Sequence, residues 1–490
     1  MKIAVITSRT AEPVIREVIT NSKAVSSGKA SVDVIAFPVA AIGVLTAGSF
    51  IRIATKYIPK LAEYDLILVP GTVRGDVSRL AELTGRVVYK ASRDPGLLPR
   101  VIDYVVEGGV LDAKRPAEEL MAVDLPDLKP QTIAFEVNGV KIPLRGPPLV
   151  LVAEIAPDIG NDLVVDVARR MEVEGAEIVI VGASRDTRNF MERVSSVVNE
   201  VDIPVIAEAP TPRMAKIAIE AGASGITISA MKADRYKPSL PEDSIVILGE
   251  RDTRVLKRAV ELYKKSGYEK VVADPVVGLP LIDYVQTVER YRSVMDLEVP
   301  IMFSAANAAS VLDADTHGIY ALLASMAVEL SASLFLVVED TYKTIHSVAE
   351  AREALRLAYR AWSRRIQPHG LGSRLLVVKQ LEPPPKPTIP TEDARLVEGY
   401  IEPVMEKGYF RIEVDHDKRL IVVEYRLGRE KRVYAGRSAR SLARVITREL
   451  DISPEHAAYL GEELAKAELA LRMGKTYIQD SDVVRMVWED

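Results

Sequence analysis

Eight short runs of β-branched and apolar residues recur between residues 149 and 360, and a helical pattern follows each run. A strand that does not alternate between apolar and polar residues is buried on both faces, which is typical of a parallel sheet covered by helices. Eight such units in succession predict an α/β fold built around a (β/α)8 barrel. The predicted strands are residues 149–154, 177–182, 203–208, 224–228, 244–249, 270–274, 299–304 and 333–339.

Most of these runs end on a polar or acidic residue. In a (β/α)8 barrel the C-terminal ends of the strands build the active site. We therefore expect the acidic residues at these ends to gather at one rim, although they are far apart in the sequence. The expected members are Glu154, Glu208, Glu250, Asp274 and Glu339.

Composition narrows the class of protein. The 490 residues suffice for two to four domains, and 48% apolar with 27% charged residues is typical of globular chains. A net charge of −5 gives no basic field for nucleic acid or for an anionic membrane. The absence of cysteine excludes disulfides, thiol catalysis and cysteine-bound metal centres, and five histidines make a site of several histidines unlikely.

Location is inferred from the same residues. Five glutamines and six asparagines, no cysteine and many charged residues are typical of an intracellular protein from a hot environment. The chain begins with a strand-like run rather than a signal peptide, so we expect a cytoplasmic protein. Residues 319–338 are long enough to suggest a membrane span, but Glu329 and three serines interrupt them. We expect a buried helix followed by the eighth strand there.

Two further domains flank the barrel. Residues 1–126 carry strand candidates separated by helical patterns, which predicts a small doubly wound α/β domain. The barrel is assigned to residues 127–378, with a closing hairpin near its start. Residues 379–395 contain a proline-rich stretch and are expected to be an extended linker. Residues 396–490 predict a small α+β domain.

The rim carboxylates have two interpretations each. Asp274 follows an apolar strand and precedes a proline, so it either caps a helix or accepts two parallel N–H donors from an amidine-like edge. Such an edge occurs in pterins, guanines and arginine-like groups. Glu208 and Glu154 end their strands in the same way, and Asp158 follows Glu154 by four residues. These side chains either hold a ligand, bind Mg²⁺ through oxygen, or pair with a rim arginine.

Three further segments carry polar groups for binding. Residues 181–188 combine a small-residue turn with Arg185, Thr187 and Arg188 at the start of a helix, which is either an anion-binding site or a surface loop with solvated charges. Asn307 lies among small residues beyond the seventh strand, where it either contacts a heterocycle or caps a helix. Lys343, beyond the eighth strand, either contacts a phosphate or is an exposed loop charge.

The first domain offers a weaker signal. Residues 70–76 follow a strand and contain two glycines, which permit either close approach to a phosphate or a tight structural turn. The hydroxyl-rich residues 7–10 follow the first strand and could face the same crevice. Neither segment matches the dinucleotide fingerprint or the P-loop.

Several ordered segments of the barrel resemble the pterin-binding barrel family, which includes dihydropteroate synthases and methyl-tetrahydropterin methyltransferases. These segments are IVIVGASRDTR, IPVIAEAPTPRMAKIAIEAGASGITIS, VVADPVVGLP and EIAPD. The resemblance implies that Asp274 and Glu208 bind the pterin ring and that Thr187 and Arg188 lie near a diphosphate. The three-part layout is similar to archaeal dihydropteroate synthase-like proteins, which implies a setting in folate or tetrahydromethanopterin biosynthesis and a possible homodimer.

The chain departs from the synthase pattern at several positions. Glu154 stands where a metal-binding asparagine is expected, and Thr227 stands where an asparagine would contact the pterin. SAANAAS replaces the segment with the pterin-contacting lysine, and its Asn307 resembles the asparagine of the methyltransferases. Three functions follow as hypotheses: a synthase that joins 6-hydroxymethyl-dihydropterin diphosphate to an arylamine, with Mg²⁺; a methyltransferase that uses a reduced pterin and a corrinoid partner; and a non-catalytic pterin-binding module.

Overall fold

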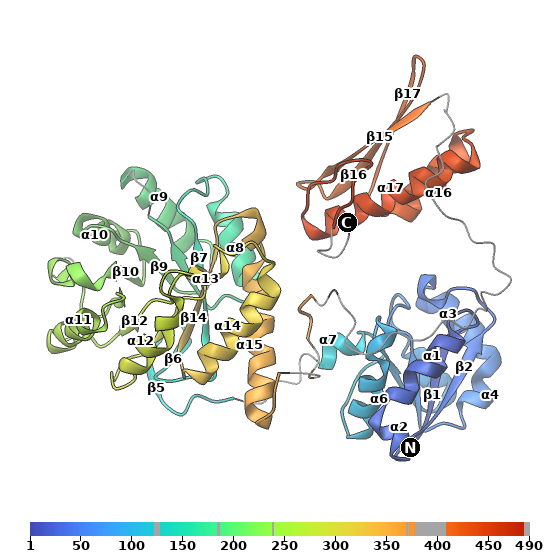
Figure 1. The fold of residues 1–490 in the computed structure, drawn as a ribbon, viewed down its shortest axis with the longest axis horizontal. Helices are drawn as coiled ribbons and strands as arrows, with labels where there is room; N and C mark the ends of the chain where they lie inside the picture. The colour runs from blue at the N-terminus through green and yellow to red at the C-terminus, as the bar shows by residue number, and fades with distance from the viewer. Residues whose placement is uncertain are drawn as a thin grey trace. The chain divides into compact units, whose positions relative to one another are not determined.

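A computed structural model describes residues 1–121, 128–183, 187–237, 240–368, 371, 373–376, 378 and 408–484, without the side chains of residues 187, 188 and 364. The chain forms two compact units, Met1–Ile389 and Pro390–Asp490 (Figure 1). The predicted linker, residues 379–395, and the predicted boundary at residue 126 lie outside the described residues.

The first domain is a parallel sheet with helices on both faces. Its strands are β1 (Lys2–Ser8), β2 (Ser31–Phe37), β3 (Leu66–Val69) and β4 (Val87–Lys90), in the order β2-β1-β3-β4. Alternate residues of β1 and β3 enter two separate hydrophobic clusters, one on each face, as expected for a doubly wound sheet. The helices are α1 (Glu12–Val18), α2 (Lys23–Ser26), α3 (Ala47–Ala54), α4 (Ile58–Leu61), α5 (Arg79–Thr84), α6 (Leu98–Val106) and α7 (Ala117–Met121).

The predicted (β/α)8 barrel is confirmed. Its sheet has eight strands in the order β12-β11-β10-β9-β8-β7-β14-β13. A parallel bridge between Ala273 and Ile301, with a 2.9 Å bond from the Ala273 N–H to the Pro300 carbonyl, joins the two end strands and closes the ring. The strands are β7 (Val150–Ile155), β8 (Ile178–Val181), β9 (Val205–Glu208), β10 (Gly225–Ser229), β11 (Ile245–Gly249), β12 (Val271–Asp274), β13 (Met302–Phe303) and β14 (Leu334–Glu339).

Helices surround the barrel (Figure 1). Residues 319–338 divide between α14 and β14, and none of the described helices is long and apolar enough to cross a membrane. The larger helical elements are α8 (Val164–Glu174), α9 (Thr187–Val198), α10 (Pro212–Glu220), η5 (Ala230–Arg235), α11 (Thr253–Lys265), α12 (Thr287–Ser293), α14 (Thr316–Glu329) and α15 (Ser347–Arg364), with the short α13 (Ala306–Ala309) before α14.

Side chains fill the barrel interior, and a hairpin joins them at one end. The hairpin consists of β5 (Ile133–Val137) and β6 (Val140–Pro143). Its residues Val137 and Ile142 belong to the same cluster as the inward-facing side chains of the barrel strands, including Val150 and Ile178, which begin their strands. The hairpin therefore packs against the end of the barrel where the strands begin. The other inward members include Val152, Ile180, Ile206, Ile245, Ile247, Val272, Met302, Leu334, Leu336 and Val338.

The second unit is an antiparallel sheet covered by two helices. Its strands β15 (Tyr409–Asp415), β16 (Leu420–Leu427) and β17 (Glu430–Gly436) form a meander, followed by α16 (Ala439–Glu449) and α17 (Pro454–Met473). Phe410, Ile412, Ile421 and Val423 alternate with exposed or half-buried residues and pack against the helices. The strong alternation explains why the sequence predicted this α+β domain.

Candidate functional site at the barrel mouth

Strand alternation gathers the predicted carboxylates at one mouth. Residues 150 and 152 of β7, 206 of β9 and 272 of β12 face the apolar interior. The next inward positions on these strands are therefore Glu154, Glu208 and Asp274, because side chains alternate between the two faces of a strand. All three positions lie at the C-terminal ends of parallel strands, so the apolar interior ends in a ring of acids.

Asp274 is the most buried of these acids, with 7% of its surface exposed. Its Oδ1 accepts a hydrogen bond from the Val276 N–H at 2.8 Å, and its Oδ2 accepts one from the Ser304 hydroxyl. Burial raises the pKa of Asp274 to about 6, although these two hydrogen bonds and the charge of Arg290 act in the opposite direction. Each carboxylate oxygen keeps capacity to accept a further donor.

Glu154 is half-buried and lies among other negative charges. Burial and the neighbouring charges of Glu208, Asp340 and Asp274 raise its pKa to about 7. A carboxyl group with this pKa exchanges protons near neutral pH, which is the range that a general acid or base requires. Glu154 is therefore close enough to Glu208, Asp340 and Asp274 for their charges to affect it.

Glu208, Thr227 and Asn307 complete the mouth. Glu208 is half-buried, and its Oε2 accepts a hydrogen bond from the Ala183 N–H at 3.0 Å. Thr227 pairs with Glu208 across β9 and β10, and its neighbours Ile226 and Ile228 pack outward, so Thr227 faces inward. Asn307, on α13, donates from Nδ2 to the Val277 carbonyl at 3.3 Å, which places it beside the segment that follows Asp274.

The predicted anion-binding residues are only partly visible. Arg185 and the side chains of Thr187 and Arg188 lie outside the described residues, so their roles stay predictions. The backbone of Thr187 begins α9, which has 12 residues and follows β8 at the mouth. The first N–H groups of a helix have no acceptor within the helix itself, so the start of α9 provides donors and a positive dipole where the sequence predicted an anion.

The ammonium group of Lys343 is hydrogen-bonded to backbone carbonyls and does not point freely into the mouth. It donates to the carbonyls of Ala309 at 3.0 Å, Ser310 at 3.2 Å and Leu312. Because an ammonium group has three donors, these contacts use all of them. Lys343 thus fastens the loop between α13 and α14, and the phosphate contact proposed for it stays a prediction without geometric support.

The predicted Mg²⁺ pair does not form a metal site among the described residues. Asp158 is exposed in the loop after β7, whereas Glu154 faces the barrel interior. Neither belongs to a group of three potential ligands that lie within reach of one ion. The pair therefore does not fit a resident metal ion, and the steps proposed below assign none to it.

In the part of the chain that the structure describes, one group of three side chains comes close enough to share an ion: Asp315, His317 and Glu350. The Leu376 N–H donates to Nδ1 of His317 at 3.3 Å, which leaves the ring proton of neutral His317 on Nε2. That nitrogen lies 3.4 Å from Oε1 of Glu350. Burial raises the pKa of Glu350 to about 7. Asp315 accepts a hydrogen bond from the His317 backbone N–H at 3.2 Å, and Glu350 accepts one from the Thr316 hydroxyl, so protein groups already occupy part of this cluster.

Two of the expected rim acids do not face the mouth. Glu339 of β14 is buried on the outer side of the barrel, where its Oε2 lies 2.6 Å from Nη2 of Arg170 on α8. Glu250 accepts hydrogen bonds from the Arg251 N–H at 2.8 Å and the Asp252 N–H at 3.3 Å, so it turns back to its own loop. The expectation that both would join the acid ring was wrong, because each lies one residue from the inward-facing position.

Sequence reasoning missed three residues at the mouth. Ser304 donates to Asp274, and Asp340 contributes to the field around Glu154. Arg290, on α12, donates from Nη1 to Oδ2 of Asp283 at 2.8 Å, while its Nε and Nη2 are buried without a hydrogen-bond partner among the described residues. The alternation of strands β13 and β14 could have identified Ser304 and Asp340, whereas no sequence signal marks Arg290.

The chain is similar in sequence to several known proteins. Residues 405–480 match a family model described as PterinBD-DUF4346. An uncharacterised protein of Methanocaldococcus jannaschii is 25% identical over 99% of this chain and 99% of its own length. A Ycf91-like protein of a Nostoc species is 46% identical over 10% of this chain and 41% of its own length.

Among solved structures, dihydropteroate synthase from Xanthomonas albilineans in complex with 7,8-dihydropteroate is 18% identical, with a TM-score of 0.38 over 46% of this chain and 96% of that chain. The synthase from Thermus thermophilus in complex with 4-aminobenzoate is also 18% identical, with a TM-score of 0.38 over 46% of this chain and 98% of that chain. The description of the family model includes a pterin-binding domain, in keeping with the resemblance expected from the sequence, whereas the full-length archaeal relative is uncharacterised.

Proposed function

We propose that the barrel mouth binds a reduced pterin through Asp274. The observation that carries this proposal is a buried carboxylate at the end of β12 that still has acceptor capacity on both oxygens. The aminopyrimidinone edge of a pterin offers two parallel N–H donors, and a carboxylate accepts both. A buried carboxylate without such donors carries a desolvation penalty, which the raised pKa of Asp274 reflects.

The neighbouring residues suit the rest of the ring. Glu208 and Thr227 lie on adjacent strands at the same mouth and offer acceptor oxygens, and Thr227 also offers a donor. Asn307 lies beside the segment after Asp274 and both donates and accepts. Reduced pterins carry donors and acceptors around both rings, so this mixture of groups fits a pterin better than it fits a purely anionic ligand.

The reaction proposed first is that of a synthase. The C–O bond between the pterin methylene and the diphosphate breaks while the arylamine nitrogen forms a C–N bond to the same carbon and releases a proton. The N–H groups at the start of α9, with Thr187 and Arg188, would stabilise the departing diphosphate. The protein then acts by positioning and electrostatic stabilisation, and no covalent residue is required.

A second function, methyl transfer between N5 of a reduced pterin and a corrinoid partner, is favoured by one observation. Glu154 has a pKa of about 7 and can therefore donate a proton near neutral pH. Proton donation to N5 makes the pterin a better leaving group, and Asn307 would hydrogen-bond on the same side. The engagement of Lys343 with three carbonyls removes one cation that a diphosphate would otherwise use.

One experiment separates the two functions. The full chain is incubated with 6-hydroxymethyl-dihydropterin diphosphate, 4-aminobenzoate and Mg²⁺, and diphosphate release is followed. For a synthase, release is lost in Arg188→Ala and in Asp274→Asn, whereas Arg258→Ala, which changes an exposed arginine of α11, leaves the rate unchanged.

Other outcomes are equally informative. Pterin binding that is lost in Asp274→Asn, without any diphosphate release, contradicts the synthase and leaves methyl transfer or simple binding. Demethylation of a methyl-tetrahydropterin by a reduced corrinoid, lost in Glu154→Gln, would then identify the methyltransferase. Pterin affinity that is the same in Asp274→Asn and in the unmodified chain refutes the barrel mouth as the pterin site.

A further inference from the structure

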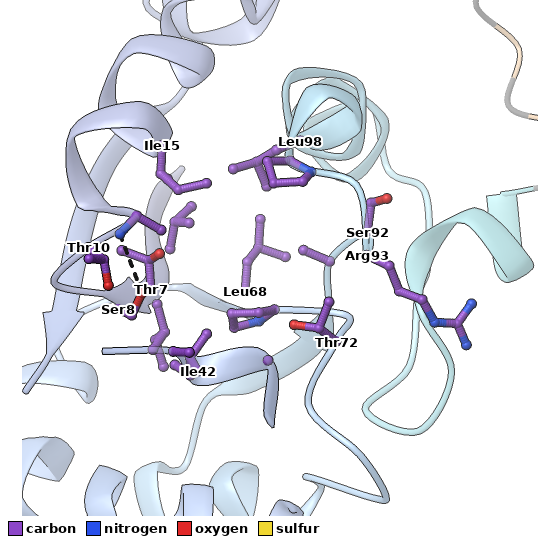
Figure 2. A pocket seen from close by; sticks show the side chains of 18 of the residues that line it. Thr7, Ser8, Thr10, Ile15, Ile42, Leu68, Thr72, Ser92, Arg93 and Leu98 are labelled. Carbon is purple, nitrogen blue, oxygen red and sulfur yellow. Dashed lines mark hydrogen bonds between the residues drawn. The ribbon is translucent and has the colours of Figure 1, made fainter. Parts of the chain in front are cut away.

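The first domain contains a cavity that the barrel chemistry does not use. The cavity has a volume of about 370 Å³ and lies at the carboxyl ends of β1 and β3 (Figure 2). The strand order β2-β1-β3-β4 places the reversal of strand order between these two strands. Open α/β sheets bind ligands in the crevice at this reversal. The sequence had indicated the same crevice from residues 7–10 and 70–76, and both segments contribute lining residues.

A tight approach of two loops forms one side of the cavity. A Cβ atom on Gly71 would lie 2.4 Å from the Ala91 carbonyl oxygen and 2.7 Å from the Arg93 nitrogen. Only glycine therefore allows the loop after β3 to contact the loop after β4 so closely. Gly71 thus serves the tight structural turn that the sequence offered as the alternative to phosphate binding. The close contact of the two loops brings Thr72 and Ser92 to the cavity.

The walls of the cavity are apolar and lie on opposite sides. Figure 2 shows Ile15 of α1 and Leu98 of α6 on one side, and Ile42 of η2 (Ile42–Val44) on the other. Leu68 of β3 lies between them. Among the residues that the structure describes, no aromatic side chain lines this cavity, so a ligand would contact aliphatic groups on both of its faces. A gap between two aliphatic walls suits a flat molecule.

Hydroxyl groups lie at the two ends of this gap. Thr7, Ser8 and Thr10 lie at one end, and Thr72 and Ser92 lie at the other (Figure 2). Thr7 is 3% exposed, and it lines the cavity. A hydroxyl both donates and accepts, so a ligand atom in the cavity could form a hydrogen bond with Thr7.

The cavity selects against charged ligands. None of its lining residues is acidic, and Arg93 is the single basic one. The guanidinium of Arg93 points away from the cavity in Figure 2 and forms ion pairs with Glu119 at 2.7 Å and Glu118 at 3.5 Å. A ligand with a net positive charge finds no carboxylate here, and an anionic ligand finds a cation that two carboxylates already neutralise.

From these observations we propose that the first domain binds an uncharged, flat, bicyclic nitrogen heterocycle in this cavity. The two aliphatic walls contact the ring faces, and the hydroxyls at the two ends bond to polar ring edges. The volume lies near the lower end of the range for small-molecule sites, which suits a ring system rather than a dinucleotide. A purine base and a free pterin share this chemistry, so either is a possible source of the ring.

The test uses guanosine and 6-hydroxymethylpterin as probes, titrated into the full-length chain by calorimetry. Both titrations are made in an Asp274→Asn background, which weakens binding at the barrel mouth, and variants of the first domain then assign the remaining binding, so the result does not depend on the function proposed for the barrel. Thr7→Val keeps the side-chain shape and removes the hydroxyl, which should weaken binding about fivefold, the effect of one neutral hydrogen bond.

A second variant does not depend on the buried core. Ala41 is exposed and lines the cavity, and Ala41→Trp should place its indole in the opening and weaken binding about tenfold or more. Val44 is 48% exposed in the same segment but does not line the cavity, so Val44→Trp serves as the control and should bind like the background chain.

The outcome for the two probes identifies the source of the ring. Binding of guanosine alone indicates a nucleoside, and binding of the pterin alone indicates that the domain captures the same class of molecule as the barrel. The proposal is overturned if neither probe binds at about 1 mM. It is also overturned if the affinities are unchanged in both Thr7→Val and Ala41→Trp, or if the anion benzoate binds as tightly as the two probes.

Discussion

Replacing Glu154 by glutamine should stabilise the protein, and by an amount that grows with pH. The pKa of Glu154 rises from an ordinary 4.5 to about 7 in the folded chain, chiefly because of burial and then because of Glu208, Asp340 and Asp274. The folded state therefore resists ionisation of this group. The contribution of Glu154 to the unfolding free energy is most favourable below pH 4.5, where the group is protonated in both the folded and the unfolded states. This contribution falls as the pH rises towards 7.

The size of the effect follows from the two pKa values. Each pKa unit corresponds to about 1.4 kcal/mol, so the loss is about 1 kcal/mol at pH 5 and about 3 kcal/mol at pH 8. Glutamine has nearly the same shape and no charge. The unfolding free energy of Glu154→Gln should therefore exceed that of the unmodified chain by about these amounts, as upper values, because part of the charge reaches solvent at the mouth.

Urea unfolding at pH 5 and pH 8, followed by circular dichroism, measures this difference. Glu220→Gln is the control, since Glu220 is an exposed carboxylate on α10 paired with Lys216 at 3.8 Å. The control should change stability by less than about 0.5 kcal/mol at either pH. A stabilisation by Glu154→Gln that is equal at both pH values would refute the reasoning, because it would come from packing rather than from a suppressed ionisation.

Three further predictions address binding and the fold. Asp274→Asn should weaken pterin binding at least about 30-fold, because the ligand loses a charged acceptor. Glu339→Gln, on the outer side of the barrel, should leave the affinity within about twofold. Equilibrium dialysis measures both affinities, and equal losses would contradict the assignment of the mouth. Arg170→Met should lower the unfolding free energy by about 3 kcal/mol, because Glu339 loses its 2.6 Å partner. Adding Glu339→Gln to this variant should restore part of the lost stability. An unchanged unfolding free energy in Arg170→Met would show that the ion pair is unimportant. Gly225→Ala should disrupt the pairing of β10 with β11, because the new Cβ would lie 2.2 Å from the Ile245 carbonyl oxygen, and an unchanged melting temperature would contradict this.

The barrel could be predicted almost residue by residue because its signal is local. Each strand is a run of β-branched residues buried on both faces, and the structure begins and ends these strands within a few residues of the sequence prediction. The same locality placed Glu154, Glu208 and Asp274 at one mouth. It failed for Glu339 and Glu250, since a shift of one position moves a side chain to the other face.

The rest of the site depends on contacts that no local pattern encodes. Arg290 reaches Asp283 and the vicinity of Asp274 because a loop and the short helix α12 fold back over the end of β12. The three carbonyls that bind Lys343 belong to a loop more than 30 residues earlier in the chain. Whether a cation at the rim is available to a ligand depends on such distant partners. The sequence therefore identified Lys343 as a candidate, but it could not predict that backbone carbonyls bind its ammonium group.

The hairpin of β5 and β6 has a consequence for the order of events. The hairpin packs against the end of the barrel where the strands start, so a ligand of the barrel would enter at the opposite end, at the mouth that carries Glu154, Glu208 and Asp274. If the barrel binds two reactants, as in the proposed synthase, both would enter at this mouth, so the one that lies deeper would bind first and its product would leave last. The kinetics expected from this geometry are those of an ordered sequential mechanism, with product inhibition by a product that stays bound at the mouth.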